Sequence, residues 1–172
     1  MPKVAFIMDE MFEDSEFRQP DERGREAGHE PVVIGLEKGK RIEGKKGKET
    51  ASTDVGIDEV RPEEFDALVI PGGYSPDKIR ANDAMVRFTR SIYEAGKPVA
   101  AICHAGWMLA EADVVRGRTV TSWPSIKTDL VNAGANWVDQ EVVEDGNLIT
   151  SRKPDDLEAF SKTLLAQIEQ RA

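Results

Sequence analysis

The sequence contains one cysteine, Cys103, and only two histidines among 172 residues. A single cysteine cannot form an intrachain disulfide or a cysteine-based metal cluster, so a reducing cytoplasm is the expected compartment. Long hydrophobic runs are also missing. The apolar stretches at Val4 to Met8 and Pro98 to Cys103 fall far short of the roughly 20 residues that a membrane span needs. The sequence therefore predicts neither a membrane segment nor a signal peptide.

Positive charge is in short supply, with 23 Lys and Arg against 32 Asp and Glu and a net charge of −9. This balance argues against nucleic acid as a default partner. Hydrophobic residues make up 40% of the chain, which is typical of a globular protein and not of a disordered one. The length fits one compact domain, which we expect to span residues 1–172.

Short β-branched runs alternate with helical stretches along most of the chain. This alternation predicts an α/β fold, in which helices cover both faces of a mostly parallel sheet. The main expected strands are 3–8, 31–36, 65–71, 99–102 and 119–122, with a hairpin at 141–150, and the expected helices are 15–28, 83–95, 124–133 and one that starts at Pro154.

The segment 37–60 breaks this alternation with glycines and short polar strands, and we expect an inserted β-hairpin there. Basic residues crowd its first half, at Lys38, Lys40, Arg41, Lys45, Lys46 and Lys48. A patch for an anion or a partner would explain them, but no aromatic residues are interleaved. We therefore interpret the segment as a solvated turn.

Ligands of open α/β sheets bind beyond the carboxyl ends of the strands. Three features fall at such ends: an acidic loop with Glu13, Asp14 and Glu16, the turn at Gly72 and Gly73, and the pair Cys103 and His104.

Cys103 follows the apolar strand 99–102 directly and precedes a short helix. A cysteine at a tight strand-to-helix turn is exposed beyond the sheet, near N–H groups that favour a thiolate nucleophile. The alternative is that Cys103 is a small buried hydrophobic residue, which is common for lone cysteines. Position alone leaves both interpretations open.

Six stretches in order carry a resemblance to a known family: Phe12 to Glu16, Phe65 to Gly73, Lys97 to His104, Asn132 to Ala135, Asp139 to Val143 and Thr150 to Arg152. Together they resemble the ThiJ/PfpI family of the class I glutamine amidotransferase-like superfamily. The nearest branch contains the PfpI intracellular protease and the YhbO-type deglycases. The resemblance implies a three-layer α/β/α flavodoxin-like sandwich.

The resemblance also implies roles for individual residues. Cys103 would be the nucleophile, Glu16 would hydrogen-bond its sulfur, and Glu13 would be a second acid near the same pocket. A carboxyl group beside a thiolate should have a raised pKa, so a protonated Glu16 could donate to the sulfur. The backbone N–H groups of Gly73 and His104 would form the oxyanion hole. Without the resemblance, Glu13 and Glu16 read as solvated acids at a helix start.

In PfpI-type proteases the histidine, here His104, acts with the cysteine and with an acid from the adjacent subunit. Asp77 stands at the matching position, where proteases of the family have glutamate, so its side chain is one methylene shorter. The sequence also has Ala105-Gly106-Trp107 where the family often has Gly-Pro-Gln, which should change the shape of the pocket.

The leading hypothesis is a stress-response, cysteine-dependent hydrolase of the deglycase or glyoxalase type. It would act on methylglyoxal or glyoxal adducts of protein or nucleotide, as a homodimer or higher homo-oligomer, without metal or cofactor. One alternative is an intracellular cysteine peptidase that uses Cys103, His104 and Asp77. A second is a non-enzymatic redox sensor or holdase chaperone, in which Cys103 is oxidised to the sulfinate. Amidotransferases need a histidine far downstream of the cysteine, and His29 and His104 cannot supply it.

Overall fold

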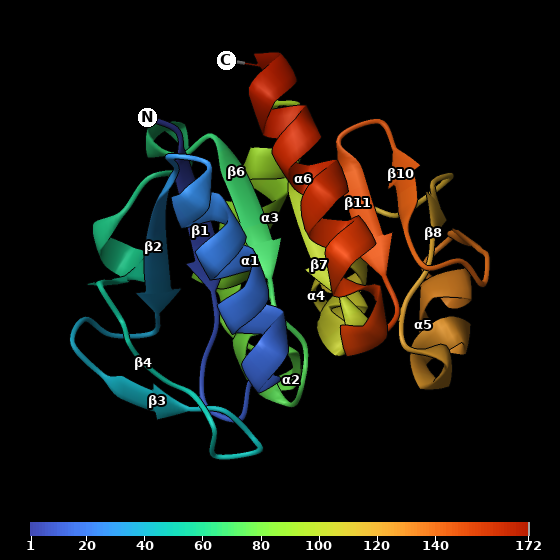
Figure 1. Cartoon of the computed structure of the whole chain (residues 1–172). Helices are drawn as coiled ribbons and strands as arrows, with labels where there is room; N and C mark the ends of the chain where they lie inside the picture. Colours follow the sequence, from blue (N-terminus) through green and yellow to red (C-terminus); the bar gives the residue numbers. More distant parts are fainter. Residues whose placement is uncertain (172) are drawn as a thin grey trace.

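The computed structural model describes residues 1–171, and within them seven strands form one sheet in the order β10-β11-β7-β6-β1-β2-β5 (Figure 1). The strands are β1 (Lys3–Ile7), β2 (Glu30–Gly35), β5 (Val55–Gly56), β6 (Ala67–Ile70), β7 (Val99–Ile102), β10 (Val143–Asp145) and β11 (Leu148–Ser151). Neighbouring strands are parallel except for the hairpin β10–β11. The predicted α/β fold with a mostly parallel sheet is confirmed.

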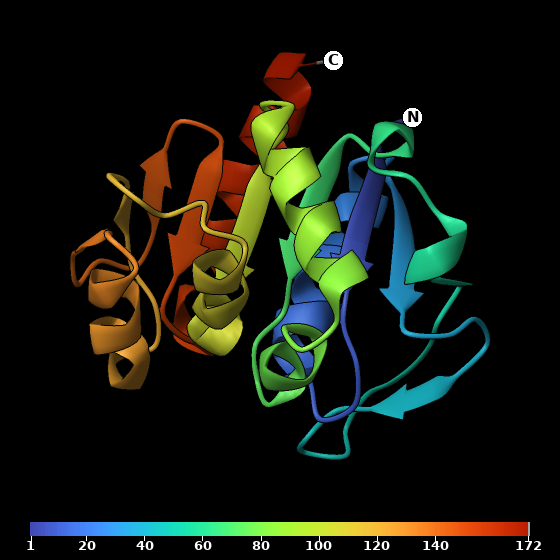
Figure 2. The ribbon, with the colours of Figure 1, turned by 180° about the vertical axis from the view of Figure 1, so that it is seen from behind.

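Helices cover both faces of this sheet. The helices α1 (Asp14–Glu26) and α6 (Leu157–Arg171) lie side by side on one face, as Figure 1 shows. The opposite face carries α3 (Asp83–Glu94) and α4 (Gly106–Glu111), with the short α2 (Ser75–Ile79) and α5 (Lys127–Asn132) packed against α4 (Figure 2). The result is the three-layer sandwich. Among residues 1–171 no helix is long and apolar enough to cross a membrane.

Two hydrophobic clusters, one on each face of the sheet, make up the core. Successive residues of β1 alternate between them, with Phe6 in one cluster and Ile7 in the other, as the period of a strand requires. All four residues of β7 are buried, which is expected of a central parallel strand. The last helix carries an apolar stripe, from Leu157 to Ile168, which is buried in the cluster beneath α1 and α6.

The segment 37–60 contains the expected hairpin, β3 (Arg41–Glu43) and β4 (Thr50–Ser52), which lies outside the main sheet. The strand expected at 119–122 differs from the prediction. Only β8 (Thr119–Val120) forms, and it pairs with β9 (Asn136–Trp137) instead of joining the central sheet. Side chains of the central sheet instead accept hydrogen bonds from the backbone of this segment. Asp145 accepts from the N–H of Thr119, and Thr150 accepts from the N–H of Thr121.

Helix α1 ends at Glu26, and it buries three acidic residues, Asp14, Glu16 and Asp21, in addition to Phe17. Asp21 forms ion pairs with Arg18 and Arg25, so its burial is compensated within the helix. Glu16 has no such cation, and its position is explained by the site at the end of the sheet.

Candidate active site

Cys103 lies at the carboxyl end of β7, at the start of a short 3-10 turn that leads into α4. Its φ of 63° is in the left-handed region, which non-glycine residues rarely adopt. Such strain persists only where the surroundings enforce it, and it is concentrated at functional sites. The predicted strand-to-helix turn is therefore present, although the side chain is only 8% exposed.

Glu16 reaches the same point from the first turns of α1. Its Oε1 accepts a hydrogen bond of 2.8 Å from the N–H of Gly72, and its Oε2 has no partner among residues 1–171. A Cβ at position 72 would lie 2.5 Å from Glu16 Oε1 and 2.8 Å from Cys103 Cβ. Only glycine fits at position 72, because any side chain there would overlap the Glu16 carboxyl group and the Cys103 side chain.

The backbone N–H groups of Gly73 and His104 face the Cys103 sulfur and favour its ionised form. Gly73 has a φ of 81°, and a Cβ there would lie 2.5 Å from the backbone nitrogen of Glu13. The loop after β1 is held against this turn, because the N–H of Glu13 donates to Gly72 O at 3.1 Å. The two N–H groups predicted for an oxyanion hole therefore converge on one sulfur.

Burial raises the pKa of Glu16 to about 8, and the charge of Glu13 acts in the same direction. Burial also raises the pKa of the Cys103 thiol to about 12, helped by the charge of Glu16 and opposed by the two N–H groups. Glu16 is therefore protonated at neutral pH, as expected. For Cys103 the balance favours the thiol, because the turn buries the sulfur and the N–H groups do not outweigh the lost hydration.

His104 is in contact with the sulfur, with Cys103 Sγ and His104 Nδ1 3.4 Å apart. Its ring is stacked at 27° on Trp123 and meets Trp107 edge-on, with centroids 6.3 Å and 5.1 Å away. Burial lowers the pKa of His104, so the ring is neutral at physiological pH. The indole N–H of Trp107 donates a 2.8 Å hydrogen bond to Asp129, which fixes the ring against His104. Trp107, in the stretch 105–107 where the sequence differs from the family, therefore forms one wall of the site.

The basic segment is largely exposed, as expected of a solvated turn, but two of its lysines also reach the site. Lys46 Nζ lies 2.7 Å from Glu13 Oε1, and Lys45 Nζ lies 3.4 Å from Glu13 Oε2. Glu13 itself is buried. Sequence reasoning missed these lysines because it sought interleaved aromatics within the segment, whereas the carboxylate that draws them in comes from the loop after β1.

Comparison with known proteins agrees with the geometry. Residues 2–167 match the family described as DJ-1/PfpI family. The chain belongs to the DJ-1/PfpI family. It is 50% identical over 164 residues to "Protein/nucleic acid deglycase 2" of Escherichia coli (strain K12), covering 95% of each chain. It is 47% identical over 168 residues to "General stress protein 18" of Bacillus subtilis (strain 168), covering 97% of this chain and 98% of that one. The crystal structure of Drosophila melanogaster DJ-1beta superposes with a TM-score of 0.89 at 32% identity, covering 97% of this chain and 90% of that one.

Within this DJ-1/PfpI chain, Cys103, His104, Glu16 and Gly73 lie together at one end of the sheet, with Glu13 beside them. The hydrogen bond expected from Glu16 to the Cys103 sulfur is not formed in residues 1–171, because Oε1 accepts from Gly72 and Oε2 has no partner. Asp77 does not join these residues. It is exposed on α2 and forms no hydrogen bond or ion pair with His104 in the described part of the chain. The prediction that it acts on the histidine of a neighbouring subunit stays a prediction. No group of three or more His, Cys, Asp or Glu side chains in residues 1–171 is arranged to hold a metal ion.

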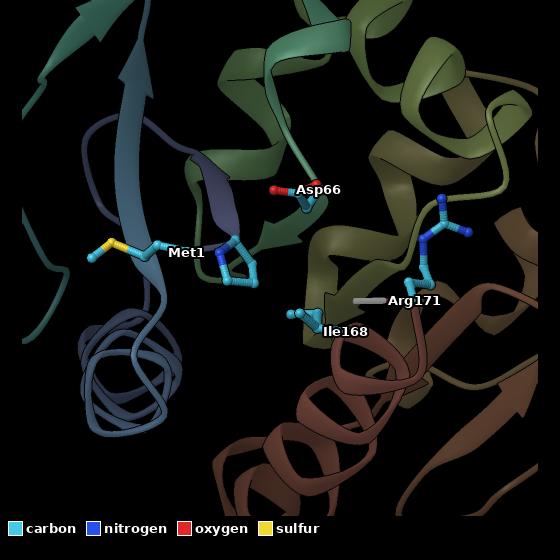
Figure 3. Close-up of a pocket in the computed structure, with 5 residues that line it drawn as sticks. Met1, Asp66, Ile168 and Arg171 are labelled. Atoms are coloured by element: carbon cyan, nitrogen blue, oxygen red, sulfur yellow. The ribbon is translucent and has the colours of Figure 1, made fainter.

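A separate hollow of about 290 Å³ opens at the amino ends of the strands, far from Cys103 in the fold (Figures 1 and 3). Met1, Pro2, Asp66, Ile168 and Arg171 line it. Figure 3 shows Asp66 and Arg171 on different sides of the opening, with Ile168 between the helix and the cavity. None of the residues singled out for chemistry in the sequence lines this hollow.

Proposed function

We propose that this protein is a stress-response, cysteine-dependent hydrolase of the deglycase or glyoxalase type, which acts on methylglyoxal or glyoxal adducts. The observation that carries the proposal is the buried pair of Cys103 and Glu16 beneath the converging N–H groups of Gly73 and His104. This arrangement suits addition of sulfur to a carbonyl carbon, because the N–H groups would bind the oxyanion that forms. The name of the Escherichia coli relative supports the same reaction class.

The two pKa values favour activation of the thiol at the moment of attack. Once Glu16 ionises near pH 8, its carboxylate can accept the thiol proton as the sulfur bonds to the aldehyde carbon. The hemithioacetal then becomes a 2-hydroxy thioester when the C1 proton moves to C2 and the hydroxyl proton on the C1 oxygen moves to the C2 oxygen, transfers open to the same carboxyl group. Water cleaves the thioester, which returns the thiol and releases the hydroxy acid. No external oxidant is needed, because C1 is oxidised as C2 is reduced.

Methylglyoxal loss and lactate formation, with loss in buffer subtracted, test this proposal. We expect Cys103→Ala to abolish lactate formation, and Glu16→Gln to lower kcat by at least about 100-fold, because a general base contributes about 10²–10⁴. The wild-type rate should rise with pH up to about 8, the pKa of Glu16, and the residual Glu16→Gln rate should lack that rise. Arg171→Ala at the opposite end of the sheet is the matched control. Lactate formation by Cys103→Ala at the wild-type rate would exclude this mechanism.

A cysteine peptidase is the second candidate, favoured by the 3.4 Å contact between Cys103 and His104. It requires Asp77 of another copy, and the exposure of this side chain on α2 leaves it accessible to one. We expect Asp77→Asn to abolish cleavage of unfolded protein by the purified oligomer while lactate formation is unchanged. A monomer that cleaves peptides would contradict the shared-acid version.

The redox-sensor alternative requires a reactive thiolate. The raised pKa of Cys103 counts against it, because the thiolate is the form that peroxide oxidises. We therefore expect mass spectrometry after mild peroxide to show little gain of two oxygens on Cys103 at pH 7. Rapid and complete sulfinate formation would favour the sensor over the hydrolase.

A further inference from the structure

One buried carboxylate, that of Asp14, holds the tip of the inserted hairpin, residues 44–49, against the site. We call this segment the lysine loop. Asp14, the first residue of α1, accepts hydrogen bonds of 2.8–2.9 Å from the backbone N–H groups of Lys46, Lys48 and Glu49. Burial opposes ionisation, yet these donors hold the pKa of Asp14 below its ordinary value. The loop therefore has a fixed place over the start of α1.

Further contacts fix the same loop from both sides. The N–H of Lys45 donates to Phe12 O at 2.8 Å, and Arg18 binds Glu49 through two nitrogens at 2.8 and 3.0 Å. A Cβ on Gly44 would lie 2.2 Å from Asp14 Oδ2, so the backbone approaches the carboxylate as closely as glycine permits. The positions of the lysine side chains thus follow from a rigid support.

Two ammonium groups of the lysine loop share one carboxylate at the mouth of the site. Lys46 forms a close ion pair with Glu13, whereas Lys45 is 3.4 Å from Glu13 Oε2 without hydrogen-bond geometry. Lys45 Nζ also lies 5.7 Å above the ring of Tyr74. The side chains of Lys45 and Lys46 keep 34% and 52% of their exposure, so both can meet a ligand from solvent.

Two carboxylates face these lysines. Glu13 pairs with Lys46, and Asp14, whose pKa its backbone donors lower, adds a second negative charge beneath the loop. The neighbouring Asp9 is paired with Lys40 at 3.3 Å. The charge of Lys45 is therefore balanced, but its ammonium group makes no hydrogen bond within residues 1–171 and is open to a ligand. The field of Lys45 also favours the ionised form of the Cys103 thiol.

We propose that Lys45 and Lys46 form a subsite for a carboxylate carried by the carbonyl substrate, so that the enzyme prefers anionic oxo compounds to neutral dicarbonyls. The preference rests on the proposed function for its reaction, but the subsite can be measured without turnover. A carboxylate that approaches the sulfur can accept a hydrogen bond from the ammonium group of Lys45, which Glu13 leaves without one. The two exposed ammonium groups also attract such a ligand locally, against the repulsion of the acidic body.

Alkylation of Cys103 measures the subsite directly. Iodoacetate and iodoacetamide react alike, with the thiolate displacing iodide, but only iodoacetate carries a carboxylate. The ratio of their rates cancels differences in thiol pKa, since both reagents need the same thiolate. We expect the wild-type ratio at pH 7 to exceed that of the uncharged thiol 2-mercaptoethanol, and we expect 0.5 M NaCl to reduce it by screening.

Variants of single lysines show which of them raises the ratio of the iodoacetate rate to the iodoacetamide rate. Lys45→Gln and Lys46→Gln should each lower it about threefold, and the double variant about tenfold, as loss of one and two nearby charges would. Lys45→Arg should keep it, because the charge is retained. Lys48→Gln is the matched control in the same loop. An unchanged ratio in the double variant, or an equal fall in Lys48→Gln, would overturn the subsite.

The same protein separates failure of the subsite from failure of the proposed function. If the ratio falls as expected but wild type forms no lactate from methylglyoxal, the subsite stands and the reaction is wrong. If lactate forms but the ratio is insensitive to both lysines and to salt, the reaction stands and the subsite is wrong. Since salt acts on the wild type, this arm does not depend on the folding of any variant.

Discussion

The two ends of the parallel sheet hold polar groups in opposite ways. At the carboxyl ends, Glu13 and Glu16 are buried, each has one oxygen without a hydrogen bond in the described chain, and Cys103 has a strained backbone. At the amino ends, Asp66 accepts an exposed 2.8 Å hydrogen bond from the N–H of Lys3, and Arg171 donates to Gly96 O at 2.8 Å in solvent. The amino ends also hold one buried atom without a partner, His29 Nδ1, but the unpaired carboxyl oxygens and the strained cysteine lie at the carboxyl ends.

The comparison shows that an open hollow and a chemical site are different things. The cavity of about 290 Å³ lies at the relaxed end (Figure 3). Its polar side chains, Asp66 and Arg171, are exposed, so solvent screens their charges. The buried end is closely packed, and there the pKa of Glu16 and that of Cys103 are both displaced. Displaced pKa values and strain, rather than volume, mark the place where chemistry is expected.

The largest expected effect comes from Glu16→Gln. The pKa of Glu16 rises from 4.5 to about 8 on folding, so between these values the folded state binds more protons than the unfolded state. The contribution of Glu16 to stability is therefore full below pH 4.5 and is lost as the pH rises through 8. Glutamine, which does not ionise, removes that loss. At about 1.4 kcal/mol per pKa unit, the stability difference between variant and wild type should change by several kcal/mol.

Urea unfolding at pH 5 and pH 8.5 measures this change. The control is Glu26→Gln, which removes an exposed carboxylate from the end of the same helix. We expect its pH dependence to match wild type. If Glu16→Gln and wild type lost stability in parallel between the two pH values, the buried carboxyl would not be the source of the contrast between the two ends.

Two glycines, one at each end of the sheet, allow the packing of the two ends to be compared. At Gly72 a methyl group would meet Glu16 Oε1, Cys103 Cβ and the carbonyl of Ile102 within 2.9 Å. At Gly28, before β2, nothing lies within 4 Å and only the φ of 84° opposes a side chain. We expect Gly72→Ala to cost about 3 kcal/mol by overpacking, and Gly28→Ala about 1 kcal/mol by backbone strain. Urea midpoints measure both, and equal costs would contradict the close-packed site.

The sequence predicted the layers of the fold and the location of the site, because both follow from local patterns. The buried strand before Cys103 and the stripe of α6 repeat at the periods of strand and helix. The state of the thiol was not predictable in this way. It depends on Glu16 and Gly73 from other segments, whose approach buries the sulfur instead of exposing it. Burial of the sulfur by segments far away in the sequence cannot be predicted from the residues next to Cys103.

The lysine loop shows the same limit for charge. The six basic residues indicated a solvent-exposed segment, since a run of like charges is usually hydrated. Their partners, Asp14 and Glu13, are about thirty positions earlier and read as ordinary helix-start acids. Only the fold shows that one carboxylate collects three backbone donors and the other draws in two ammonium groups.

Asp14→Asn should have a smaller effect than Glu16→Gln or Gly72→Ala, confined to one side of the site. Three hydrogen bonds to a carboxylate become weaker or are lost, so we expect about 2 kcal/mol of destabilisation. The lysine loop should open locally first, which would increase trypsin cleavage after Lys45, Lys46 or Lys48. Asp155→Asn, an exposed acid before α6, is the control. Unchanged proteolysis at these three bonds would show that other contacts hold the loop.

The smallest effect is expected at the relaxed end. Arg171→Ala removes an exposed hydrogen bond to Gly96 O, and surface changes of this kind alter stability by less than about 0.5 kcal/mol. It should leave the ratio of iodoacetate to iodoacetamide rates at Cys103 unchanged, since the two groups lie at opposite ends of the strands. Urea unfolding and alkylation of one preparation measure both quantities. A change in the ratio would mean that α6 transmits the state of its end to the site, and the two ends could no longer be treated as independent.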